Sequence, residues 1–255
     1  MSRFPSLVGQ SVPDVVFHTR AEGVWRDVSS ADIFAHQKVV VFSLPGAFTP
    51  TCSTSRVPRY EELYETFRGL GVDRIVCVSV NDAFVMDAWK REQQVHKVEF
   101  LPDGNGAFTA GMGMLVDKSA VGFGQRSWRY AMVVENRVIT HMFVEPDVEG
   151  DPYEVSDADT VLRALAPEVR LPPDILLLTK PFCGHCTRAK AALSAAGLSY
   201  AEVAATPRML RAVSAVPTTP RVFVDGQLLG GADELATWLS AQGMRWRGQP
   251  PASQA

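Results

Sequence analysis

An apolar strand that ends in a turn and a cysteine constrains the fold of this chain more than any other feature. Lys38–Leu44 is rich in β-branched residues, which is typical of a buried parallel strand, and a Pro-Gly pair ends it. Apolar residues then recur at helical spacing, so we expect one helix over 52–69, kinked near Val57 by Pro58. This order places Cys52 at the start of a helix.

A thiol at a helix N-terminus faces unpaired backbone N–H groups and the positive end of the helix dipole. Both favour the thiolate, which is the reactive form. Out of this context a lone cysteine would be a small buried hydrophobe. The strand–turn–helix order therefore predicts that Cys52 is a nucleophile.

Composition limits the class of protein. The 255 residues suffice for one large domain or two small ones, and 46% of them are hydrophobic. A net charge of −3 without blocks of like charge does not favour a nucleic-acid or membrane partner. No apolar run approaches the roughly 18 residues of a membrane span, and the first residues lack a signal-peptide pattern, so we expect a cytoplasmic protein. In such a reducing compartment the four cysteines are reactive or inert groups and not a disulfide framework.

The residues around this motif alternate between strand and helix patterns, which predicts an α/β domain. A β-rich start precedes the motif, and the apolar strand 72–80 with Cys77 at its middle leads into an amphipathic helix. Further along we expect a flexible apolar segment over 111–115, a strand over 125–134, a loop over 147–151 and a helix over 156–165 capped by Ser156. Cys77 is best interpreted as a buried structural thiol.

Two arginines stand out in the strand 125–134. Arg126 and Arg129 are three positions apart, which puts them on opposite faces of a strand, so only one can readily reach Cys52. An arginine there would stabilise the thiolate and hydrogen-bond a substrate oxygen. Solvated strand charges are the alternative.

Residues 45–52, Pro-Gly-Ala-Phe-Thr-Pro-Thr-Cys, resemble the peroxidatic motif of the peroxiredoxins, in the form that the peroxiredoxin-5-like subfamily has. The resemblance covers roughly 1–165, through 100–106, 124–131 and 144–146. It implies a thioredoxin-like domain in which Cys52 attacks a hydroperoxide and Arg126 lies at the pocket rim. The remaining catalytic residues that it implies are Pro45, Thr49 and Arg129.

The same resemblance implies a homodimer or larger assembly that pairs around the active-site loop. Phe48, Pro50 and the segment 111–115 offer apolar material for such a surface.

A second domain begins after a proline-containing linker. We expect domain limits of 1–166 and 174–245, with a linker over 167–173 and a tail over 246–255. The apolar strand 174–179 leads to Cys183-Gly-His-Cys186 and a helix over 187–196, which is a thioredoxin-type redox signal. The alternative, half of a zinc site, lacks a second pair of ligands downstream, and we predict no metal.

Residues 174–242 resemble the glutaredoxins, through the CxxC motif, Thr-Pro at 219–220 and Gly-Gly-Ala-Asp at 230–233. The resemblance implies a cis Thr219–Pro220 bond. Gly184-His185 departs from the usual Pro-aromatic pair and is similar to protein disulfide isomerase; His185 either favours the Cys183 thiolate or has no effect. The helix before the cis-proline is expected to be reduced. The glutathione-binding residues that the resemblance implies are Lys180, Thr219, Pro220, Ala232 and Asp233.

The combined prediction is an α/β chain of two thioredoxin-like domains in tandem. It would reduce hydrogen peroxide and alkyl hydroperoxides at Cys52, and the Cys183/Cys186 pair would return electrons from glutathione. Glutathione is the reducing co-substrate, and no bound cofactor is expected. A protein disulfide oxidoreductase and a redox-signalling protein are the alternatives.

Overall fold

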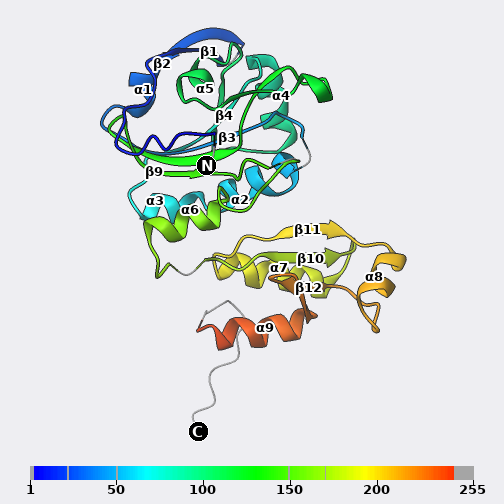
Figure 1. Ribbon diagram of the computed structural model, residues 1–255. Helices are drawn as coiled ribbons and strands as arrows, with labels where there is room; N and C mark the ends of the chain where they lie inside the picture. Colours follow the sequence, from blue (N-terminus) through cyan, green and yellow to red (C-terminus); the bar gives the residue numbers. More distant parts are fainter. Residues whose placement is uncertain (1–2, 22, 50, 149, 170, 244–255) are drawn as a thin grey trace. The chain divides into compact units, whose positions relative to one another are not determined.

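The computed structural model describes residues 3–21, 23–49, 51–148, 150–169 and 171–243 (Figure 1). The chain divides into two compact units, Met1–Val169 and Arg170–Ala255. Pro50 and the expected tail 246–255 lie outside the described residues. No described helix is long and apolar enough to cross a membrane.

The first unit begins with an antiparallel hairpin of β1 (Val16–Ala21) and β2 (Val24–Ser29), followed by α1 (Ser30–Phe34). Ser29 caps this short helix: its hydroxyl accepts from the Asp32 N–H, and the Asp32 carboxylate accepts from the Ser29 N–H. The hairpin and the capped turn agree with the β-rich start predicted from the sequence.

A five-stranded sheet in the order β5-β4-β3-β8-β9 forms the centre of this unit. Strands β3 to β5 run parallel, whereas β8 and β9 are antiparallel additions. A separate pair, β6 and β7, is antiparallel. The bounds are β3 (Lys38–Leu44), β4 (Arg74–Ser79), β5 (Glu99–Pro102), β6 (Leu115–Asp117), β7 (Gln125–Ser127), β8 (Tyr130–Glu135) and β9 (Val138–Val144).

Both faces of β3 are buried, as its continuous apolar run predicts. Val39 and Val41 join a cluster with Phe34 and Phe108. Phe42, on the opposite face, stacks on Tyr60 with ring centroids 4.1 Å apart. The helical elements of the unit are η1 (Cys52–Arg56), α2 (Val57–Glu62), α3 (Tyr64–Gly69), α4 (Ala83–Glu92), α5 (Ala107–Gly111), η2 (Ser119–Val121) and α6 (Ala158–Leu165).

The prediction of a single helix over 52–69 is wrong in detail. Cys52–Arg56 is a π-helical turn in which the Val57 N–H donates to the Cys52 carbonyl, and α2 and α3 are separated at Leu63. Proline has no N–H to donate, so Pro58 fits at the start of α2, where that N–H is not needed. The kink predicted near Val57 takes the form of this π-helical turn.

Three further expectations are corrected. The strand 125–134 is two strands, β7 and β8, which are interrupted at Trp128 and Arg129 and pair with different partners. Helix α6 is capped by Asp157 and not by Ser156, whose hydroxyl is directed to Glu145. The segment 111–115 is not an exposed apolar surface, because Met112 and Met114 are fully buried in the core.

The second unit has a four-stranded sheet in the order β11-β10-β12-β13, in which β10 and β11 are parallel and the other pairs antiparallel. Helices α7 and α9 contribute Leu193, Leu235 and Leu239 to the same core as Ile175 and Val222. Helix α7 begins at Gly184, earlier than expected. The bounds are β10 (Ile175–Thr179), α7 (Gly184–Ala195), β11 (Ala201–Ala204), α8 (Pro207–Val213), β12 (Arg221–Val224), β13 (Gln227–Gly230) and α9 (Ala232–Ala241).

Candidate active sites

Cys52 is the first residue of the π-helical turn and is fully buried. The Ser53 N–H donates to the Thr49 carbonyl at 3.1 Å, which ties the turn to the preceding loop. The Ser53 hydroxyl in turn accepts from the Trp89 indole N–H at 3.0 Å. These contacts hold the thiol at a helix start, as the motif predicts.

Arg129 lies beside this thiol, with Nη1 3.4 Å from the Cys52 Sγ. Its side chain is 1% exposed and also pairs through Nη2 with the Asp151 carboxylate. Burial by itself lowers the pKa of the guanidinium, but the charges of Cys52 and Asp151 oppose it and the net pKa is raised. Arg129 is therefore a permanent cation beside the sulfur.

Glu145 organises the loop that covers Arg129. It follows β9, is 1% exposed, and accepts hydrogen bonds from the N–H groups of Glu154, Val155 and Ser156 at 2.8–3.1 Å and from the Ser156 hydroxyl at 2.6 Å. Burial tends to raise the pKa of this carboxyl, yet the hydrogen bonds outweigh it and the pKa is lowered. The Glu145 N–H also donates to the Arg129 carbonyl at 3.1 Å.

This loop brings two side chains to the guanidinium of Arg129. Asp151 accepts from Nη2, and the ring of Tyr153 lies with its centroid 5.5 Å from Arg129 Cζ. Sequence reasoning predicted a loop over 147–151 but missed both roles and that of Glu145. The sequence signal that could have located Glu145 is the Glu-Pro pair at 145–146, which belongs to the family resemblance.

A second buried arginine was also missed. Arg56 ends the π-helical turn, is fully buried, and donates through Nη2 to the Tyr130 carbonyl at 2.6 Å. Its Cζ lies 5.4 Å from the ring centroid of Phe42 and 5.7 Å from that of Tyr153. Within the described residues its Nε and Nη1 have no hydrogen-bond partner. It places a second cation against Tyr153, the ring that also contacts Arg129.

The other predicted residues of this site lie on the same loop or at its border. Pro45 follows β3 directly, and the Thr49 hydroxyl donates to the Gly46 carbonyl at 2.8 Å. Arg126 reaches the Val80 carbonyl and not Cys52. Only one of the two arginines reaches Cys52, as expected. The reason differs from the expected one, because they lie on different segments and not on opposite faces of one strand.

Cys77 lies in the middle of β4 and is fully buried. Burial raises the pKa of its thiol well above the ordinary value, and the nearby Cys52 charge adds to this effect. A thiol that resists ionisation is a poor nucleophile, in agreement with a structural role.

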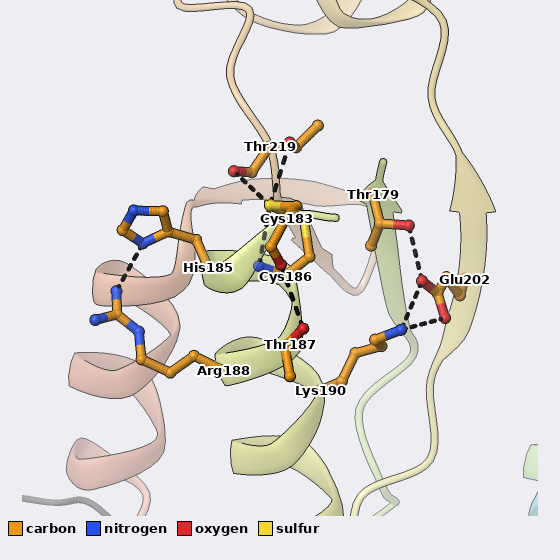
Figure 2. The surroundings of a disulfide bond; sticks show 9 residues. All are labelled: Thr179, Cys183, His185, Cys186, Thr187, Arg188, Lys190, Glu202 and Thr219. Carbon is orange, nitrogen blue, oxygen red and sulfur yellow. Dashed lines mark hydrogen bonds and ion pairs between the residues drawn. A yellow bond between two sulfur atoms is a disulfide. The ribbon is translucent and has the colours of Figure 1, made fainter. Parts of the chain in front are cut away.

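The second unit holds a disulfide between Cys183 and Cys186, with Cα atoms 5.2 Å apart (Figure 2). Cys183 caps α7, since its Sγ accepts from the Cys186 N–H at 3.2 Å. The Thr219 hydroxyl donates to the same Sγ at 3.5 Å, and the Thr219–Pro220 bond is cis, as the resemblance implies. Cys183 is half-buried and Cys186 buried, so Cys183 is the accessible sulfur.

The remaining predicted glutathione-binding residues lie after β10 and at the start of α9. Lys180 is exposed directly after β10, and Ala232 and Asp233 form the first turn of α9. The Asp233 carboxylate accepts from Arg188 Nη2 at 2.6 Å, and the same nitrogen lies 3.2 Å from His185 Nδ1. Among the described residues no cluster of His, Cys, Asp or Glu could hold a metal ion.

The two sites define two kinds of chemistry. A buried nucleophilic thiol at a helix start, held by a buried arginine, is built to attack a small electrophile such as a peroxide and to stabilise the charge that develops. A disulfide at a helix start beside a cis-proline is that of a dithiol–disulfide oxidoreductase.

Comparisons with known proteins agree with this division. The Redoxin family matches residues 7–162, and the Glutaredoxin family matches residues 175–229. The chain is 50% identical over 239 residues to the hybrid peroxiredoxin hyPrx5 of Haemophilus influenzae, covering 92% of this chain and 99% of that protein. It is 54% identical over 172 residues to peroxiredoxin sll1621 of Synechocystis sp., covering 62% of this chain and 91% of the relative.

Solved structures give the same result for the first unit. Reduced Prx3 of Vibrio vulnificus in complex with hydrogen peroxide superposes with a TM-score of 0.58 at 40% identity, covering 62% of this chain and 98% of that one. The chain therefore belongs to the peroxiredoxin family, in the hybrid form that carries a glutaredoxin domain. Two thioredoxin-like domains in tandem are confirmed, and the protein is an oxidoreductase of the thiol peroxidase class.

Proposed function

We propose that this protein reduces hydrogen peroxide and alkyl hydroperoxides with electrons from glutathione, and that its own glutaredoxin domain returns the peroxidatic cysteine to the thiol. The proposal is carried by one observation: Cys52 lies 3.4 Å from Arg129 in a buried site, while the only other cysteine of that unit, Cys77, has a raised pKa. Cys77 is therefore a poor resolving partner for Cys52, which supports a reductant from outside this unit.

The first step takes place at Cys52. The thiolate attacks one peroxide oxygen, the O–O bond breaks, and the departing oxygen takes a proton to leave as water or an alcohol. The sulfur becomes a sulfenic acid. Arg129 stabilises the thiolate and then the charge on the departing oxygen, and Thr49 is positioned on the loop to orient the peroxide.

Regeneration requires two electrons from two molecules of glutathione. The first thiol condenses with the sulfenic acid, which releases water and forms a mixed disulfide on Cys52. The Cys183 thiolate then attacks the glutathione sulfur, which frees Cys52 and leaves glutathione on Cys183. A second glutathione then removes it as glutathione disulfide. Alternatively, Cys186 attacks the Cys183 sulfur, releases glutathione as the thiol and forms the Cys183–Cys186 disulfide, which two glutathione molecules reduce.

Fusion gives this scheme a kinetic advantage. A glutaredoxin domain tethered through a short proline-containing linker meets the oxidised site at an effective concentration on the millimolar scale. We also propose a cytoplasmic location, because both the dithiol and glutathione need a reducing compartment.

We further propose a homodimer or larger assembly that pairs around the active-site loop. Phe48 supports this proposal because its side chain is 53% exposed on that loop, with its ring 6.4 Å from the ring of Trp89. In the segment 111–115 the two methionines, Met112 and Met114, are fully buried and offer no such surface, and Pro50 lies outside the described residues.

The test is an assay of the purified chain with hydrogen peroxide and glutathione, in parallel with glutathione-driven reduction of insulin disulfides. We expect peroxide-dependent oxidation of glutathione that the Cys52→Ser variant abolishes. Insulin reduction that persists in this variant, together with no peroxide turnover by the natural chain, would instead favour a protein disulfide oxidoreductase.

A further inference from the structure

The end of strand β4 supports the loop that carries Thr49 and Cys52. Asn81 follows β4, and its amide oxygen accepts from the Ala47 N–H at 3.0 Å and from the Ser79 hydroxyl at 2.7 Å. A backbone N–H can only donate a hydrogen bond, so the atom that faces Ala47 is the amide oxygen and not the nitrogen. Asn81 therefore ties the loop that follows β3 to the end of the neighbouring strand.

The backbone of Asn81 is itself held in place. Its N–H donates to the Ser79 carbonyl at 2.8 Å, and Arg126 donates through Nη1 to the carbonyl of Val80, the preceding residue. A Cβ placed on Gly46 would lie 3.8 Å from the Asn81 oxygen and 4.0 Å from Arg126 Nε. The Asn81 amide thus meets the loop from a fixed position.

One peptide group lies between Asn81 and Thr49. The peptide that joins Gly46 to Ala47 donates through its N–H to Asn81 and accepts through its C=O from the Thr49 hydroxyl at 2.8 Å. Because a peptide group is planar, the direction of its N–H fixes the direction of its C=O. An acceptor at the N–H also makes the C=O a stronger acceptor. Asn81 therefore determines where the Thr49 hydroxyl proton points.

This orientation decides what the Thr49 hydroxyl can offer to a peroxide. A hydroxyl has one proton and two lone pairs, and the proton is already donated to the Gly46 carbonyl. The lone pairs are left to accept from the O–H of a hydroperoxide. We propose that Asn81 is a positioning residue for peroxide reduction, which acts through the Gly46–Ala47 peptide and Thr49. The proposal rests on the reaction proposed at Cys52 and does not involve glutathione.

The chain offers a matched control for the loss of one such hydrogen bond. The Asn136 amide oxygen accepts from the His36 N–H at 2.8 Å, in the turn between β8 and β9. Asn136 has a φ of 45°, which alanine disfavours, so Asn136→Ala should cost at least as much stability as Asn81→Ala. A fall in rate that comes from lower stability alone would therefore appear in both variants.

The experiment is a double-mutant cycle on the full chain with Asn81→Ala and Thr49→Val. Stopped-flow mixing of the reduced chain with hydrogen peroxide measures the rate constant for oxidation of Cys52. We expect Asn81→Ala to lower this rate constant about three- to tenfold in the natural chain and less than about twofold in Thr49→Val. Asn136→Ala should match the natural chain.

Two further measurements separate positioning from a loss of structure. Alkylation of Cys52 by iodoacetamide, followed by mass spectrometry over a range of pH, should be unchanged in Asn81→Ala, because alkylation does not use the Thr49 hydroxyl. Asn81→Asp keeps an oxygen acceptor for Ala47, so above the pKa of the Cys52 thiol it should retain the peroxide rate constant within about threefold. This variant keeps the inference testable if Asn81→Ala does not fold, since a loss of more than about tenfold would overturn it.

Three results with Asn81→Ala would overturn the inference alone: an unchanged peroxide rate constant, an equal fall in the natural and Thr49→Val backgrounds, or an equal fall in the alkylation rate. Failure of peroxide to oxidise Cys52 in the natural chain would instead overturn the proposed function, and this inference with it.

Discussion

Glu145→Gln tests whether the loop 151–156 keeps Arg129 in place. In the natural chain one carboxylate oxygen accepts from Val155 N–H, Ser156 N–H and the Ser156 hydroxyl, and the other accepts from Glu154 N–H. A glutamine can put its carbonyl oxygen where three donors converge, but its NH₂ group then faces the Glu154 N–H. One charge-assisted bond is replaced by two opposed donors, which should lower stability by about 1.5–3 kcal/mol.

Catalysis should fall as well, because the loop carries Asp151 and Tyr153 to the guanidinium of Arg129. We expect kcat/KM for peroxide to fall at least about tenfold, with the roughly 10²–10³ of a lost transition-state donor as the upper limit. Hydrogen exchange should show faster exchange at the amides of 154–156, and stopped-flow peroxide kinetics measures the rate.

The pH dependence of stability provides a second test of the role of the Glu145 carboxylate. The folded-state pKa of Glu145 is lowered from its ordinary value of 4.5, so its contribution to stability is complete above pH 4.5 and is lost as pH falls through the folded-state pKa. The glutamine variant should lose this part of the acid dependence.

Glu61→Gln is the matched control for Glu145→Gln. The Glu61 carboxylate also accepts from three backbone N–H groups, those of His96, Lys97 and Val98, at 2.8–3.1 Å. Glu61→Gln should speed hydrogen exchange at the amides of 96–98 without lowering kcat/KM for peroxide. Faster exchange at 154–156 with unchanged peroxide kinetics in Glu145→Gln would refute the role assigned to the loop.

Three further predictions concern the first unit. Arg129→Ala should lower kcat/KM for peroxide by about 10²–10³ in stopped-flow measurements, and the opposite pattern, a loss in Arg126→Ala alone, would reverse the assignment. Cys77→Ala should keep glutathione-driven turnover, since the thiol resists ionisation; loss of steady-state turnover with the first peroxide reaction intact would make it a resolving cysteine. Light scattering should detect a dimer or larger assembly that Phe48→Ser weakens, and a 27.9 kDa monomer of the natural chain at working concentration would contradict this.

Sequence patterns correctly predicted those structural elements that depend on neighbouring residues in the chain. The β-branched run of β3, the Ser29 cap and the cysteine at a helix start all depend on residues adjacent in sequence. The π-helical turn was missed because Pro58 indicates a disturbance without specifying its form. The burial of Met112 and Met114 depends on the strands that cover them, which a short apolar segment does not reveal.

Those residues of the peroxidatic site that belong to a recognisable motif could be predicted from the sequence. Cys52 and Arg129 came from motif and resemblance, and their contact at 3.4 Å joins residues 77 positions apart. Glu145, Asp151 and Arg56 were missed because their roles arise from hydrogen bonds and burial across the fold. A charged residue in a loop or helix is usually solvated, and its sequence neighbours do not show that it is buried.

The most direct test of the central claim is steady-state turnover of Cys183→Ser with peroxide and glutathione. The account predicts one stoichiometric burst of peroxide consumption and no sustained turnover, whereas Cys186→Ser should keep substantial activity through transfer of glutathione from Cys183 to a second glutathione. Normal turnover of Cys183→Ser with glutathione alone, or a Cys52–Cys77 disulfide as the main oxidised species by mass spectrometry, would contradict the claim that the fused domain is the reductant.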